Sequence, residues 1–145
     1  MYNSAVHAYN KINLNVESKE KLLIMAYEHA IKFLEKSKIE QNRKNFYESF
    51  QYIMKSKKII RELQNSLNME IKEISLPLFR LYDYMDYRLN QVNVGLGVME
   101  PVDEVIELLK GLKEAWVEAI KKELAKKQQS EQKVSINKTS EGISI

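Results

Sequence analysis

The feature that most constrains the fold is the pattern of apolar residues between positions 75 and 94. They recur every three or four positions, which places them on one face of an α-helix and on no face of a strand. These residues are Leu78, Leu81, Tyr82, Met85, Leu89 and Val92. Ser75 is a suitable N-cap, and Pro77 falls in the first turn, where a missing N–H is tolerated. The pattern predicts a helix that begins near Ser75 and ends before Gly95.

This helix carries more apolar surface than one core contact requires. Leu76, Tyr84 and Tyr87 project from the side opposite the core face. A soluble helix that is apolar nearly all round is either buried on every side or binds a second partner. The surplus therefore indicates a chain that binds another protein along a helical surface.

Three other segments show helical periodicity, over residues 18–40, 45–68 and 101–127. The expected core side chains of the first are Leu23, Ala26, Tyr27, Ala30 and Leu34, and those of the second include Phe46, Phe50, Ile53 and Ile60. Four helices joined by short breaks predict an all-α, antiparallel, up-down four-helix bundle over residues 18–127.

The two ends of the chain differ from the bundle in composition. Residues 1–17 include the apolar Tyr9, Ile12 and Val16 but are too few to fold alone, so we expect an N-terminal capping segment that lies across the bundle. Residues 128–145 are rich in Gln, Ser, Lys and Asn and are predicted to be a flexible tail.

Composition narrows the class of protein. The formal net charge is +3 and basic residues alternate with glutamates along the helices, so nucleic-acid binding is not expected. The chain has no cysteine for disulfides or thiolate metal sites. The longest apolar run, residues 22–27, is too short to cross a bilayer, and residues 1–7 lack a signal-peptide pattern. We expect a cytoplasmic protein with no membrane insertion.

Catalytic and metal-binding patterns are missing from the sequence. Neither histidine, His7 or His29, is preceded by Glu at the three-residue spacing of di-metal bundles. A glycine-rich phosphate loop and a nucleophile elbow are absent too, so we expect no enzyme, no cofactor and no metal. His29 followed by Lys32 leaves open a histidine-phosphotransfer bundle, although Phe33 stands where such a site needs glycine.

Side chains beside the expected core faces are the candidates for partner binding. On the last helix, Leu108 and Leu112 start a second apolar stripe, and small residues that follow would let another helix approach closely. Plain core is the alternative for the flanking isoleucines, because bundle helices bury about three of every seven positions. The predicted partner-binding residues are Ile24, Ile31, Tyr84, Tyr87, Leu108, Leu112, Ala115 and Ala119.

Six segments carry a pattern along the chain: Ala8-Tyr9, Val16, Leu22–Leu34, Leu63–Glu70, Leu78–Leu89 and Leu109–Trp116. In their order and spacing, these segments resemble the FliS family of flagellar secretion chaperones. The most specific piece is Leu-Tyr-Asp-Tyr-Met at residues 81–85. The chain departs from the family pattern at Lys19, at His29 and at the pair Lys72-Glu73, where the family commonly has proline or glycine.

The resemblance implies a non-catalytic chaperone that binds the C-terminal segment of flagellin in the cytoplasm. Such a protein prevents premature polymerisation and delivers flagellin to the export apparatus. It also implies that Tyr9, Ile12 and Val16 act as a lid on the flagellin track. An export-gate protein and a co-chaperone are further candidate partners, and the oligomeric state is open between a monomer and a segment-swapped dimer. A generic helical adaptor and the phosphotransfer bundle of His29 are the alternative functions.

Overall fold

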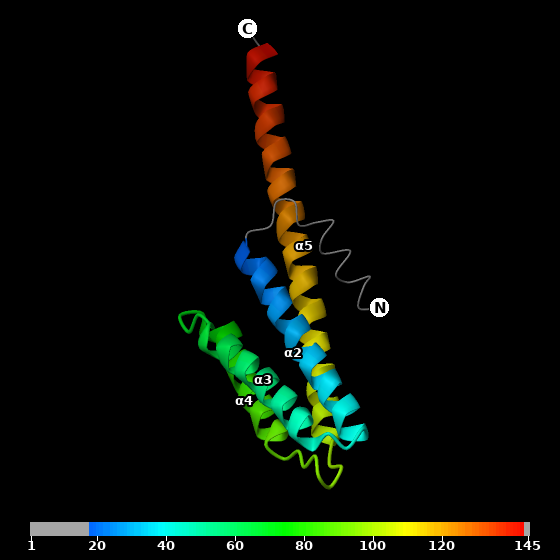
Figure 1. Cartoon of the computed structure of the whole chain (residues 1–145). Coiled ribbons are helices and arrows are strands. Elements are labelled where there is room, and N and C mark those ends of the chain that lie inside the picture. The colour runs from blue at the N-terminus through cyan, green and yellow to red at the C-terminus, as the bar shows by residue number, and fades with distance from the viewer. Residues whose placement is uncertain (1–17, 144–145) are drawn as a thin grey trace. The chain divides into compact units, whose positions relative to one another are not determined.

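The computed structural model describes residues 18–143, with side chains described from residue 19 to residue 134. The described residues form α2 (Ser18–Asn42), α3 (Phe46–Asn65), α4 (Lys72–Leu89) and α5 (Glu100–Ile143), as Figure 1 shows. Between residues 18 and 143 there is no β-strand, and Asn93 and Val98 form an isolated antiparallel bridge. The predicted all-α class is therefore confirmed.

The chain divides into two compact units. Among the described residues, one unit is formed by residues 22–113, and the other by residues 18–21 together with residues 114–143. Residues 22–113 include α3, α4 and parts of both α2 and α5. This unit therefore contains the four-helix core.

Serine side chains join α2 to α3. The Ser49 hydroxyl donates to the Ser37 carbonyl at 2.7 Å, and the Ser56 hydroxyl donates to the Ala30 carbonyl at 3.0 Å. All three serines are buried, so these bonds satisfy polar groups that water does not reach. Because residue numbers fall along α2 as they rise along α3, the two helices run antiparallel.

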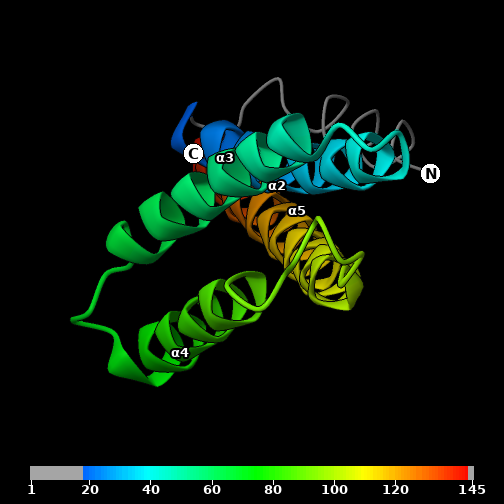
Figure 2. The same cartoon turned by 60° about the horizontal axis from the view of Figure 1, so that its bottom comes forward.

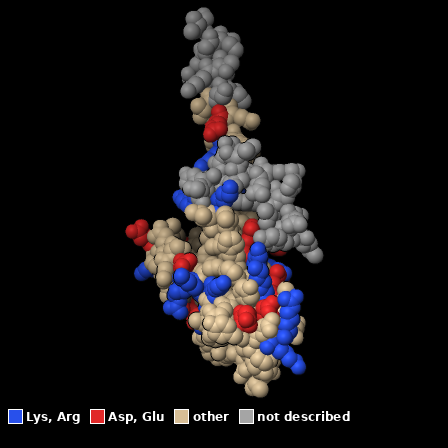
Figure 3. All heavy atoms as spheres, viewed as in Figure 1, with Lys and Arg blue, Asp and Glu red and all other residues tan. Residues whose placement is uncertain are grey.

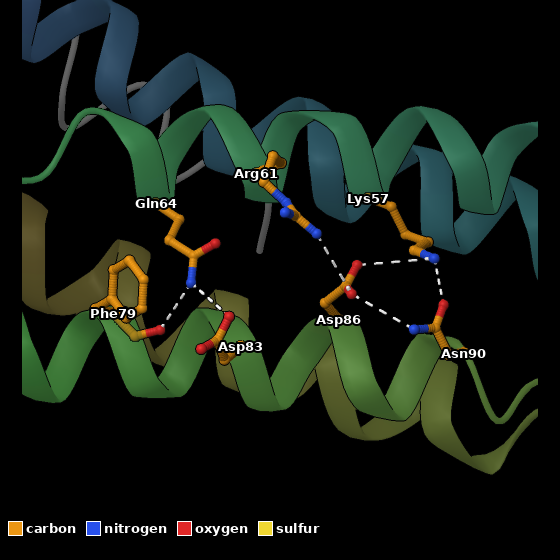
Figure 4. Close-up of polar contacts among 7 residues, drawn as sticks. All are labelled: Lys57, Arg61, Gln64, Phe79, Asp83, Asp86 and Asn90. Carbon is orange, nitrogen blue, oxygen red and sulfur yellow. Dashed lines mark hydrogen bonds and ion pairs between the residues drawn. The ribbon is translucent and has the colours of Figure 1, made fainter.

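Polar contacts join α3 to α4 (Figure 4). The Gln64 amide donates to the Phe79 carbonyl at 3.1 Å and to the Asp83 carboxylate at 2.7 Å. Nearer the start of α3, the Lys57 ammonium lies 3.7 Å from the Asp86 carboxylate. These pairs also run in opposite directions along the chain, so α3 and α4 are antiparallel.

Ion pairs give the direction of α5 within residues 22–113. Lys38 pairs with Asp103 at 2.5 Å, and Glu28 pairs with Lys113 at 3.7 Å, so α2 and α5 are antiparallel. Successive helices therefore alternate in direction, and Figure 2 shows the loop that leads from α4 to α5. Figure 3 shows basic and acidic side chains interspersed over the face in view.

The core contains a hydrogen-bonded pair of tyrosines among aliphatic side chains. The hydroxyls of Tyr27 and Tyr82 share a hydrogen bond, and both residues are buried. Burial and the neighbouring Tyr27 raise the pKa of Tyr82 well above its ordinary value, so this phenol stays protonated. Other core residues are Ile24, Ala30, Ile31, Leu34, Ile53, Ile60, Leu63, Met85, Leu89, Val102, Val105, Ile106 and Leu109.

The boundaries of α4 differ from the prediction. The helix begins at Lys72, and the Ser75 hydroxyl donates to the Asn68 carbonyl at 2.5 Å, so Ser75 is not the N-cap. It ends at Leu89, several residues before the predicted stop. The chain then reverses direction in the turn that the Asn93–Val98 bridge closes. Gly97 in this turn has a positive φ of 73°, a conformation that favours glycine.

The last helix is longer than predicted. We expected it to end near residue 127, whereas α5 continues to Ile143. The Gln, Lys and Glu residues of this stretch have good helix propensity, and the side chains from 125 to 134 are exposed, so the helix needs no apolar stripe there. The flexibility of residues 128–145 stays a prediction.

Two other expectations concern the ends of the chain and membranes. The capping segment with Tyr9, Ile12 and Val16 lies outside the described residues, so its role as a lid also stays a prediction. Across the described helices, no stretch is both long enough and apolar enough to cross a bilayer.

Candidate partner-binding surface

Exposed tyrosines and half-buried leucines lie together on two helices of the 22–113 unit. On α4, 43% of Tyr84 and 59% of Tyr87 is exposed. On α5, Leu108 and Leu112 are half-buried. We call these four residues the α4–α5 surface. They were all predicted to bind a partner, and each is open to solvent at least in part.

An ion pair sets the register between the two helices. The Arg88 guanidinium donates from Nε to Oε1 of Glu104 at 3.1 Å. In an antiparallel pair, the residue four positions before Arg88 lies opposite the residue four positions after Glu104. On this register Tyr84 is level with Leu108, which places one tyrosine and one leucine of the α4–α5 surface at the same height along the two helices.

Tyr84 on α4 interacts with Glu104 in the first turns of α5. The hydrogen bond that Tyr84 donates to Glu104 raises the pKa of the Tyr84 phenol. The same bond, together with Arg88, holds the pKa of the Glu104 carboxyl below its ordinary value of 4.5. The folded chain therefore favours a neutral phenol and an ionised carboxylate at this surface.

The lowered pKa of Glu104 predicts a change in stability on the acid side. A carboxyl whose pKa is lower in the folded state stabilises the fold above the unfolded pKa, and this contribution is lost as the pH falls through the folded pKa. Thermal unfolding of Glu104→Gln should therefore differ most from the unchanged chain above pH 4.5, and the gap in Tm should shrink below it. Glu118→Gln, at an exposed position on α5, is the control. A gap that stays constant with pH would contradict this account.

Ala115 and Ala119 are exposed on α5 in the other compact unit. Their short side chains leave the helix backbone accessible to another helix, as the predicted role requires. Their part in partner binding stays a prediction.

Two predicted surface residues are core residues. Only 1% of Ile24 and 4% of Ile31 is exposed, so neither presents a surface to a partner in this structure. The apolar stripe of α2 is wide, and its buried part lies toward the isoleucine side, whereas Leu23, expected in the core, and Phe33, on the opposite flank, are half-buried. Ile24 and Ile31 are therefore not part of the proposed partner-binding surface.

An exposed apolar surface on α3 was not predicted from the sequence, because its residues were expected in the core. Phe46 and Phe50, expected to be buried on α3, are 37% and 50% exposed. The sequence contains a signal for this: Lys57 and Arg61 follow on the same side of the helix at helical spacing. A side that bears two cations is rarely a continuous core face.

Comparison with known proteins identifies the family. A family model described as flagellar protein FliS matches residues 1–123, most of the chain. The chain belongs to the FliS family. A flagellar secretion chaperone FliS from Campylobacter jejuni is 30% identical over 117 residues, which cover 80% of this chain and 91% of that protein. One from Bacillus subtilis is 28% identical over 118 residues, which cover 80% and 86% of the two chains.

Membership of the FliS family helps to choose between the alternative functions. The imidazole of His29 is exposed on α2, as a phosphotransfer site would need, but FliS is a family of flagellar secretion chaperones. Within the described residues, no three His, Cys, Asp or Glu side chains gather in a group that could hold a metal ion. The chaperone class is therefore the best supported of these functions.

Proposed function

We propose that this FliS-family chain binds the C-terminal segment of flagellin in the cytoplasm and delivers it to the export apparatus. While bound, the segment is kept from polymerising early. Membership of the FliS family is the observation that carries the proposal. The α4–α5 surface provides apolar contacts of the kind that binding such a segment needs.

The physical character of the α4–α5 surface suits an amphipathic helix that folds on binding. Tyr84 and Tyr87 offer large apolar rings with polar tips, and Leu108 and Leu112 add half-buried apolar side chains. Apolar side chains of this kind can bind the residues that recur at spacings of three and four along a helix. Ordering a disordered segment costs about 2–5 kcal/mol of the interaction energy, which keeps the complex separable.

Co-expression with flagellin tests the proposal. The full chain is produced with intact flagellin, or with flagellin that lacks its last roughly 40 residues, enough for about three average helices. In size-exclusion chromatography the chain should elute with intact flagellin and separately from the truncated form. Elution apart from both forms would leave the generic adaptor as the better explanation, and equal binding of both would place the contact elsewhere on flagellin.

A further inference from the structure

The side of α3 that faces α4 changes character along its length. Lys57, Arg61 and Gln64 make polar contacts with α4, as Figure 4 shows. One to three turns earlier, the same side of the helix carries large apolar residues that are exposed. These are Phe46, Phe50 and Met54, exposed by 37%, 50% and 42%, and we call them the α3 stripe.

The end of α4 explains this change. Because α4 stops at Leu89, the first turns of α3 have no helix facing them on this side. The loop that follows α4 leaves a pocket of about 290 Å³ beside them. It is lined by Phe50, Ile53, Met54, Lys57, Leu89, Asn90, Val92, Asn93 and Val94. The side of α3 is thus charged where a helix covers it and apolar where it is open, which marks an interaction site.

The surroundings of the α3 stripe are positively charged. Lys44 precedes the stripe by two residues, Lys58 follows Met54 by one turn, and both lysines are exposed. Lys57 and Arg61 lie 3.7 and 3.6 Å from the one Asp86 carboxylate, so this cluster keeps a net positive charge.

Two acidic groups near the stripe are already paired, Asp86 with Lys57 and Arg61, and Glu40 with Arg43 and Asn45. The loop over residues 90–99 contains no charged residue. At about 100° per residue, Glu48 lies roughly 160° and Glu62 roughly 120° around α3 from Phe50, so both glutamates are on other sides of the helix. A partner that covers the stripe therefore meets lysines at its edges.

We propose that the α3 stripe and its pocket dock an amphipathic helix of another protein, whose apolar side is flanked by Asp or Glu. A large aliphatic or aromatic side chain of that helix enters the pocket, and its neighbours contact Phe46 and Met54. The acidic flanks pair with Lys44 and Lys58. A second copy of this chain fits less well, because a symmetric contact would bring like charges together. The proposal uses no residue of the α4–α5 surface.

Synthetic peptides test the charge preference. One fluorescent helical peptide of about four turns carries Leu and Phe at spacings of three and four with Glu on both flanks. A second peptide has Lys in place of each Glu, and a third keeps Glu but replaces the apolar residues by Ser. In fluorescence anisotropy with the full chain, the first should bind at least about 10-fold more tightly than either of the others. Equal binding of the first two, or none, would overturn the proposal.

Substitutions on the chain locate the binding site. Phe50→Glu combined with Met54→Glu should weaken binding of the first peptide by at least about 30-fold. Ile74→Glu, at a residue of α4 that is 60% exposed, and the pair Tyr84→Ala with Tyr87→Ala should bind it as the unchanged chain does. Circular dichroism confirms that each variant is folded. Loss of peptide binding in the tyrosine variant alone would overturn the proposal. Analytical ultracentrifugation of the free chain gives a second check: self-association that Phe50→Glu abolishes would also overturn it.

Discussion

Replacing Lys113 by alanine is expected to lower the free energy of unfolding by about 3 kcal/mol, because it breaks a buried ion pair. The Lys113 ammonium lies 3.7 Å from the Glu28 carboxylate, and the two side chains are only 8% and 11% exposed. Without this counter-charge, the carboxylate of Glu28 is poorly solvated in the folded state but fully solvated in the unfolded state. Urea denaturation at neutral pH measures the difference.

A double variant separates loss of charge from loss of packing. Glu28→Leu with Lys113→Met replaces the ion pair by apolar groups of similar size, and such replacements are often neutral or stabilising. We expect the double variant to recover most of the stability that Lys113→Ala loses. If the double variant is as unstable as the single one or less stable, the pair acts through its packing and the electrostatic explanation fails.

Replacing both Tyr84 and Tyr87 by alanine is expected to weaken flagellin binding by about 100-fold or more, on the premise of the proposed function. Aromatic residues at the centre of an interface each contribute 2 kcal/mol or more when they are hot spots, which is about 30-fold per residue. Calorimetric titration with a peptide of the flagellin C-terminal segment measures the affinity. Stability should change little, since the residues are 43% and 59% exposed.

Tyr47→Ala is the matched control for this experiment. Tyr47 is a tyrosine with 72% of its surface exposed, and it lies on α3 away from the α4–α5 surface. This variant should bind the peptide as the unchanged chain does. If Tyr47→Ala loses as much affinity as the double variant, or if the double variant keeps full affinity, the α4–α5 surface is not the binding site.

Local patterns predicted the helices well and their ends poorly. The predicted helix over residues 18–40 matches α2, because a long periodic stripe with an N-cap signal is a local property. The start of α4 was missed, because Ser75 uses its hydroxyl for the Asn68 carbonyl and not for a cap. Helix ends depend on contacts with preceding and following loops, which periodicity does not report.

The exposure of the proposed partner-binding residues was predicted in part, and the errors share one cause. Tyr84 and Tyr87 lie opposite a strong core stripe, so their exposure followed from helical periodicity alone. Ile24 and Phe50 lie on flanks, and a flank is buried only if a neighbouring helix covers it. For Ile24 a neighbour covers the flank, whereas for Phe50 the facing helix has already ended.

The sequence by itself determined that this chain is all-α, which follows from residues that are close together along the chain. It also determined that the chain is a member of the FliS family, which follows from the order and spacing of segments along the chain. The tertiary structure decided which flanks are core, and it brought Glu28 to Lys113 and Tyr27 to Tyr82. The physical reason is that periodicity states which residues share a helix face. Burial and pairing depend on which distant helix lies against that face and where it stops.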